Sequence, residues 1–221
     1  MTTRFDRLIA ALARTELSER ACNQYSRTTG DLRGNTVRRR NLRLYLGEMA
    51  AIGPRVLLIG EAVSHRGGRL TGIAFVSETV MLRGVDIASP PHHILGAPAG
   101  YRKATSGEQL STEASATMVW GTIRHLDPLP LLWNAFPFHP FHPASPLSNR
   151  VPSSSELEIG SRFIHTILGF FPIEHVVAIG NQAASSLTRL GIEHEKVRHP
   201  SMGGKKTFID GMARLSHSSQ P

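Results

Sequence analysis

Three short apolar runs divide the second half of the chain into units. VLLIG (56–60), LLWNAF (131–136) and HVVAIG (175–180) each end at a loop rich in glycine, asparagine, histidine or proline. Runs of this length, separated by helical patterns, are typical of buried parallel strands in an α/β fold. A fourth, shorter strand is expected near residues 196–198. The pattern therefore predicts an α/β protein with a mainly parallel sheet.

Helical spacing of apolar residues appears between and before these runs. Phe5, Leu8, Ile9 and Leu12 recur at helical intervals, so residues 3–20 are expected to form an amphipathic helix. The other expected helices are 37–51, 112–126, 154–170 and 182–190.

Local signals predict how two of these helices begin and end. Ser153 and Glu156 have the spacing of a capping box, Asn181 is expected to cap the last helix, and Gly191 to end it. The segments 84–108 and 137–152 are rich in Pro, Gly, Ser and His and are expected to be long loops.

No repeat or linker divides the chain. We therefore expect a single domain over residues 1–221, with an N-terminal helical extension over 1–52 and a core over 54–210. The two tryptophans, Trp120 and Trp133, are expected in the core.

Charge and cysteine content narrow the classes of function. The formal net charge is +8, which favours a polyanionic partner because bound phosphates release counterions. The arginine cluster of residues 38–43 is a solvated face or a phosphate contact. Cys22 is the single cysteine, so an internal disulfide and an all-cysteine metal cluster are excluded within one chain. No apolar run is long enough to cross a bilayer, and we expect a cytoplasmic monomer with no membrane partner.

The polar loops after the strands are expected to meet at one place. In open parallel sheets, ligands bind beyond the carboxyl ends of the strands. That edge carries GEAVSHRGGRLTGIAF (60–75), NAFPFHP (134–140), GNQA (180–183) and HPSMGG (199–204). The first of these is rich in glycine, but it matches neither phosphate-binding glycine pattern, G-x-x-x-x-G-K-[ST] or G-x-G-x-x-G.

Two of these loops resemble the signature motifs of uracil-DNA glycosylases. GEAVSHRGGRLTGIAF is similar to the first motif, in which GQDPYH leads to Gly-x-x-Phe. Gly60 and His65 fall on the motif's first glycine and its histidine, and Gly72 and Phe75 on the closing pair. HPSMGG resembles the second motif, HPSPLS, with the segment 199–201 intact.

Two further segments extend the resemblance to residues 54–210. LLWNAF resembles the family's strand that ends in the uracil-reading asparagine, here Asn134, and AIGNQA resembles the strand that ends in a Gly-x-x-Ala turn. The resemblance implies a three-layer α/β/α fold with a central, mainly parallel four-stranded sheet. It also implies a DNA repair glycosylase that flips uracil out of the helix and hydrolyses its bond to the sugar, without metal or cofactor. The products would be free uracil and an abasic site.

The resemblance also implies roles for individual residues. Phe75 would stack on the flipped base, Asn134 would read its pairing edge, and His199 would donate a hydrogen bond to O2 as negative charge develops there. The expected base-pocket residues also include Gly60, Ala62, Ser64 and His65. The expected DNA contacts are Arg69, Ser201, Met202, Gly203, Lys205 and Lys206, with Met202 as an apolar wedge in the duplex.

Two positions depart from the family's pattern. The aspartate that orients or activates water falls on Ala62, and Glu61 is the nearest carboxylate, so Glu61 is our candidate for that role. Ser64 and His65 are alternatives. The tyrosine that excludes the thymine methyl falls on Ser64, which leaves open how thymine is rejected.

Two other functions stay open from the sequence. Ala62 is also compatible with a protein that holds uracil-containing or abasic DNA without cutting it. The α/β pattern alone is compatible with a base- or nucleotide-binding protein that has no DNA role.

Several polar residues have plain structural interpretations. His92, His93, His139 and His142 lack carboxylates at ligand spacing and are expected to be exposed loop residues, with no metal site. Asn149 and Arg150 either contact DNA or cap the next helix.

Overall fold

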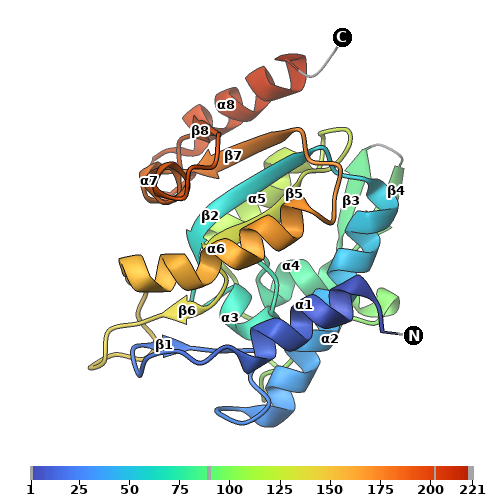
Figure 1. The fold of residues 1–221 in the computed structure, drawn as a ribbon. Coiled ribbons are helices and arrows are strands. Elements are labelled where there is room, and N and C mark those ends of the chain that lie inside the picture. The colour runs from blue at the N-terminus through green and yellow to red at the C-terminus, as the bar shows by residue number, and fades with distance from the viewer. Residues whose placement is uncertain (1, 89–90, 202, 219–221) are drawn as a thin grey trace.

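A parallel four-stranded sheet forms the centre of the molecule in the computed structural model, which describes residues 2–88, 91–201 and 203–218. The strand order is β5 (Leu131–Phe136), β2 (Val56–Ala62), β7 (His175–Ile179) and β8 (Glu195–Val197), and all three pairings are parallel. Each predicted strand is present. The α/β fold with a central parallel sheet is therefore confirmed (Figure 1).

The connections between the strands place helices on both faces of the sheet. The chain runs from β2 outward to β5 by way of α5 (Ala114–Ile123), then crosses back through α6 (Ser154–Leu168) to β7 and through α7 (Asn181–Arg189) to β8. The connection through α5 runs in one direction along the sheet, and those through α6 and α7 run in the other. Because such crossovers are right-handed, α5 lies on one face of the sheet and α6 and α7 on the other. The last helix, α8 (Lys205–Ser218), contacts α5, which gives three layers (Figure 1).

The predicted capping and termination signals are present with one exception, but the first helix, predicted over residues 3–20, already ends at Arg14. The predicted capping box at the start of α6 is present, with reciprocal hydrogen bonds between Ser153 and Glu156. The prediction that Asn181 caps α7 is wrong: the cap residue is Gly180, at φ +90°, and Asn181 is the first helical residue. A Cβ at position 180 would lie 3.1 Å from the Cβ of His199, so the tight turn favours glycine. Gly191, at φ +66°, directly follows the C-cap residue Leu190 and ends α7 as predicted.

The segment 84–108 is not the long loop that its composition predicts. It contains an antiparallel hairpin of β3 (Val85–Ala88) and β4 (Pro91–Ile94), followed by the 3-10 helix η1 (Ala97–Ala99). A cross-strand bond of 2.8 Å joins His93 Nδ1 and Asp86 Oδ1. His92 and His93 are exposed as predicted, but they belong to a strand. Two-residue and four-residue strands carry too few positions for alternation to reveal them.

The first fifty residues pack on the same core as the sheet. They form α1 (Arg4–Arg14), the short strand β1 (Ala21–Cys22) and the long helix α2 (Leu32–Ile52). Leu12 and Leu42 are buried in the cluster that also holds the sheet residues. The hydroxyl of Tyr45 accepts a hydrogen bond of 3.0 Å from the backbone N–H of Leu132, so α2 protects the outer edge of β5.

The remaining short elements lie around the ends of the sheet. β6 (His139–Pro140) pairs antiparallel with β1, while α3 (Gly68–Thr71) and α4 (Glu78–Arg83) follow β2. Trp120 and Trp133 are each 2% exposed, which confirms their place in the core. Within the described part of the chain, no helix is both long and apolar enough to cross a membrane.

Candidate functional site

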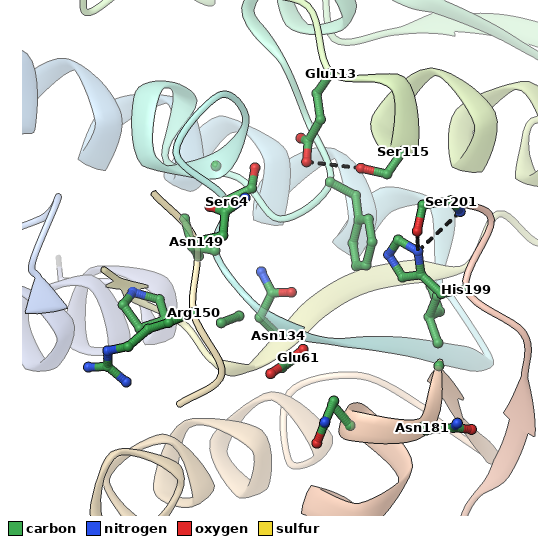
Figure 2. A pocket seen from close by; sticks show the side chains of 18 residues that line it. Glu61, Ser64, Glu113, Ser115, Asn134, Asn149, Arg150, Asn181, His199 and Ser201 are labelled. Carbon is green, nitrogen blue, oxygen red and sulfur yellow. Dashed lines mark hydrogen bonds between the residues drawn. The ribbon is translucent and has the colours of Figure 1, made fainter. Parts of the chain in front are cut away.

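A pocket of about 410 Å³ lies at the carboxyl edge of the sheet. The strands β2 and β7 are neighbours, but the connection after β2 leads to β5 on one side and the connection after β7 leads to β8 on the other. Open α/β sheets form a binding crevice between two such strands, at their carboxyl ends. Residues from all four predicted loops line it, together with residues from two other loops (Figure 2). The polar lining residues are Glu61, Ser64, Glu113, Ser115, Asn134, Asn149, Arg150, Asn181, Gln182, His199 and Ser201.

Phe75 provides an aromatic wall in a strained backbone conformation. Its φ is +54°, in the left-handed region that bulky residues rarely adopt. The indole N–H of Trp120 donates a 3.1 Å hydrogen bond to the Phe75 carbonyl and holds the turn in place. Strain of this kind persists only where the surrounding structure enforces it, and it is concentrated at ligand sites.

Asn134 lies next to the ring of Phe75, on β5. The residue pairs with Gly60 across the sheet, and its side chain is buried. A Cβ at Gly60 would lie 2.6 Å from Asn134 Oδ1 and closer still to the Phe75 ring, so the absence of a side chain there lets carboxamide and ring approach each other. No described residue hydrogen-bonds to the Asn134 amide, so its donors and acceptor remain available to a ligand.

His199 lines the same pocket from the turn after β8. The backbone N–H of Ser201 donates to its Nδ1 at 3.2 Å, and the Ser201 hydroxyl lies 2.7 Å from the same atom (Figure 2). An Nδ1 that accepts these bonds leaves the ring proton on Nε2. Burial, and to a lesser extent Arg198, lowers the His199 pKa below its ordinary value of 6.5. The imidazole is therefore neutral at pH 7 and has one N–H to donate.

Glu61 is a half-buried carboxylate at the end of β2. Burial raises its pKa above the ordinary value of 4.5, and its Oε1 is buried without a hydrogen-bond partner among the described residues. An unpaired carboxylate in a cleft, with a raised pKa, is a candidate proton acceptor or a stabiliser of nearby positive charge.

Glu113 and Ser115 were not among the residues predicted from the sequence. They lie at the start of α5, in a polar stretch with no motif, where Ser115 Oγ donates to Glu113 Oε1 at 2.9 Å. Glu113 Oε2 is buried without a described partner. The pocket thus contains two carboxylates, and Figure 2 shows them on opposite sides of Asn134.

The two residues at 149 and 150 also line the pocket. Arg150 is bonded to Glu156 on α6 and to the Phe141 carbonyl, so its guanidinium anchors the loop. Asn149 Oδ1 accepts the backbone N–H of His65 at 3.0 Å, which joins this loop to the turn after β2.

The N-terminal helices support the turn that carries Phe75. Tyr25 Oη donates to the Gly72 carbonyl at 2.9 Å, Arg38 Nε to that of Leu70 at 3.2 Å, and Asn41 Nδ2 to that of Thr71 at 3.2 Å. Arg38 is buried rather than part of a solvated arginine face.

The structure places the other predicted residues around the pocket. Ala62 lines the pocket, whereas the His65 ring packs against His139 outside it. Arg69 donates to the His65 carbonyl and lines a neighbouring cavity of about 720 Å³. Lys205 and Lys206 are exposed at the start of α8, and Gly203, at φ +76°, lies in the preceding turn. Met202 lies outside the described residues.

The expectation that all four loop histidines are exposed is wrong for His139. Its ring is fully buried and its Nδ1 lies 2.9 Å from the Val63 carbonyl, where burial lowers its pKa. This contact with the Val63 carbonyl holds the turn after β2 against the buried ring. His142 is exposed, as predicted. Across residues 2–88, 91–201 and 203–218, no group of three or more His, Cys, Asp or Glu side chains is arranged to hold a metal ion.

Comparison with known proteins identifies the fold. No protein-family model matches the sequence, and no curated protein matches it. Among solved structures, the chain is similar to wild-type SMUG2 of Pedobacter heparinus, with a TM-score of 0.64 and 14% sequence identity. The similarity covers 99% of this chain, including its N-terminal helices, and 98% of the other. SMUG2 is a member of the uracil-DNA glycosylase superfamily, so this chain has a uracil-DNA glycosylase-like fold.

Proposed function

We propose that this chain is a DNA glycosylase of the uracil-DNA glycosylase superfamily, which removes uracil from DNA and leaves an abasic site. One observation carries the proposal: an aromatic face, a free carboxamide and a neutral imidazole line a single pocket at the carboxyl edge of the sheet. These are the three groups needed to hold an extruded pyrimidine and to cleave its bond to the sugar.

Base recognition would depend on Phe75 and Asn134. The flipped uracil stacks on the Phe75 ring, while the Asn134 amide donates to O4 and accepts from N3–H. Cytosine presents the opposite donor and acceptor pattern on this edge. A cytosine in the pocket would therefore leave the buried amide unpaired, at a cost of about 1–3 kcal/mol for each unsatisfied group.

Bond cleavage would depend on His199. As the C1′–N1 bond breaks, its electron pair leaves with the base and negative charge spreads to O2. The Nε2–H of His199 donates to that oxygen, and Ser201 keeps the tautomer that allows it. Because the imidazole is neutral, it stabilises the developing charge by a hydrogen bond and need not transfer its proton.

Glu61 is the candidate for the second half of the reaction. A water molecule adds to C1′ and releases a proton, and the unpaired Glu61 carboxylate is suited either to orient that water or to stabilise the positive sugar. Ala62 can do neither. We assign this role to Glu61 because it is the pocket carboxylate at the end of β2, next to Ala62.

The DNA backbone would lie across the basic loops around the pocket. Ser201, Gly203, Lys205 and Lys206 follow the His199 turn, and Arg69 follows β2; with a net charge of +8 they favour bound phosphates. Met202 is proposed as the apolar wedge that occupies the space left by the base. We propose that the chain acts as a monomer in the cytoplasm.

A base-release assay tests this function. An oligonucleotide with one uracil is incubated with excess protein, and free uracil and alkali-sensitive sites are measured with time. Equal amounts of both are expected, with no strand cleavage before alkali. Tight binding of abasic DNA without base release would instead identify a non-cleaving binder. Affinity for uracil or a nucleotide, without salt-dependent DNA binding, would identify a base-binding protein with no DNA role.

A further inference from the structure

A second cavity, of about 720 Å³, lies between the N-terminal helices and the turn after β2. It shares no lining residue with the base pocket, but the short helix α3 borders both. Arg69 and Leu70 of α3 line the second cavity, whereas Gly68 lines the base pocket. The remaining walls come from β1 and the chain after it, the start of α2 and residues 103–106.

The charged side chains that line this cavity are mostly cations. The cations are Arg33, Arg38, Arg69 and Lys103, and the carboxylate is Asp31. Arg38 takes that carboxylate, with 3.2 Å between its Nη2 and Asp31 Oδ2. Within the described part of the chain, the other three cations have no carboxylate within ion-pair distance. The cavity therefore carries positive charge that the fold does not neutralise.

Arg69 is the cation that most needs a partner. Its guanidinium is half-buried, and its Nε donates to the His65 carbonyl at 3.2 Å, but no described group accepts from its two terminal nitrogens. Burial lowers the Arg69 pKa, and the nearby cation of Arg38 adds to this effect. A half-buried guanidinium beside a second one is unfavourable unless an anion joins them.

Two more cations approach the same cavity from other elements. Arg33 is exposed in the first turn of α2. Lys103 Nζ donates to the carbonyls of Ser106 at 3.2 Å and Gly107 at 2.6 Å, which holds the ammonium beside the cavity. An ammonium has three N–H groups, so Lys103 keeps one for a ligand.

The cavity is coupled to the base pocket through the turn that carries Phe75. Arg38 Nε donates to the Leu70 carbonyl at 3.2 Å, so both buried guanidinium groups hold carbonyls of this turn. A planar guanidinium that is fixed on one edge by an anion has little freedom on the other. An anion in the cavity should therefore restrain the turn.

We propose that this cavity binds a phosphate group between Arg69, Arg33 and Lys103, and that the bound phosphate restrains the turn that carries Phe75. Phosphate oxygens can accept charge-assisted hydrogen bonds from several cations at once. The phosphate belongs either to the DNA strand outside the base pocket or to a free nucleotide. Its binding does not depend on the proposed glycosylase function.

Titration calorimetry with inorganic pyrophosphate, at constant ionic strength, tests the site. The double variant Arg33→Gln/Lys103→Gln removes two cations from the cavity and keeps Arg69 on the turn. Because each lost contact is a charge-assisted hydrogen bond, pyrophosphate should bind the variant at least about tenfold more weakly than the wild type.

The matched control is Arg7→Gln/Lys196→Gln, which changes the net charge equally. Both residues are exposed and neither lines the cavity, so the affinity should stay within about twofold of the wild type. If the two double variants bind pyrophosphate equally well, or if the wild type does not bind it, the inference is overturned.

Hydrogen exchange of the wild type tests the restraint on the turn. Saturating pyrophosphate should slow amide exchange in residues 68–75 by about threefold or more, because the turn opens less often when the guanidinium groups are fixed. Unchanged exchange in this segment with pyrophosphate bound would overturn the coupling. Neither measurement requires base release, so failure of the proposed function is distinguishable.

Competition with DNA identifies the source of the phosphate. An abasic oligonucleotide that displaces pyrophosphate from the wild type would show that a phosphate of the strand occupies the cavity. Simultaneous binding of both would assign the cavity to a free nucleotide. Either outcome supports a phosphate site there.

Discussion

Glu156 and Glu61 are both removed from water, but only one of them is paired. The Glu156 side chain is 6% exposed and accepts hydrogen bonds from Arg150 at 2.6 and 2.8 Å and from the Ser153 backbone at 2.7 Å. Burial alone would raise its pKa, but these donors outweigh burial and lower it. Glu61 has no such donors on Oε1, and burial raises its pKa.

The difference separates a carboxylate that stabilises the fold from one that is held ready for chemistry. The desolvation of Glu156 is offset by a cation and a helix N-terminus. The desolvation of Glu61 is not offset within the described residues, so this side chain costs stability until something binds. Unsatisfied groups in a cleft are typical of functional sites.

The largest effect on stability is expected at the paired carboxylate. Glu156→Ala leaves the buried Arg150 guanidinium without its carboxylate partner, which should lower the free energy of unfolding by about 3 kcal/mol. The control is Glu158→Ala, an exposed position on the same helix, where no change beyond about 0.5 kcal/mol is expected. Urea unfolding at pH 7 measures both, and equal midpoints would show that the ion pair does not stabilise the fold.

Because the pKa of Glu156 is lowered, its stabilisation should be present at neutral pH and be lost as the pH falls through that pKa, below 4.5.

For the pocket residue His199 we expect a loss of activity without a loss of stability. His199→Ala removes the donor to O2 and should slow uracil release about 10²–10³-fold, while the unfolding midpoint stays near that of the wild type. Single-turnover rates and urea unfolding of the same preparation measure both quantities. A large fall in stability with an unchanged rate would assign His199 a structural role.

The unpaired carboxylate should show a trade-off between activity and stability. Glu61 must be ionised to act, so the wild-type rate should fall as the pH drops through its raised pKa, above 4.5. Glu61→Gln should remove this acid limb and lower the rate at pH 7. The same variant should melt at a higher temperature than the wild type at pH 7, and the difference should shrink at acid pH, where Glu61 is protonated. A lower melting temperature at pH 7 would show that Glu61 stabilises the fold.

The smallest effect is expected at the exposed lysines of α8. Replacing Lys205 and Lys206 by alanine should reduce the slope of log affinity against log salt by about 1 for each phosphate that the variant no longer binds. Binding of abasic DNA over a series of salt concentrations measures the slope. An unchanged slope would place the DNA backbone away from this turn.

The sequence predicted the sheet and its site edge because those features are local. The three longest strands of the sheet, β2, β5 and β7, are mostly apolar runs, and the capping box of Ser153 and Glu156 depends on residues three apart. Glu113 could not be found in this way. It enters the pocket because α5 crosses behind the sheet and because Gly67 has no side chain to block it, and neither fact has a signal near position 113. His139 was misjudged for the same reason, since its burial depends on the distant turn at Val63.

The proposed glycosylase activity is tested most simply by the release of free uracil from a uracil-containing single strand by excess wild-type protein. Complete release is expected, with one alkali-sensitive site for each uracil and none in the matched cytosine strand. Wild-type protein that is folded and binds the strand, yet leaves every uracil attached after many hours, would contradict it.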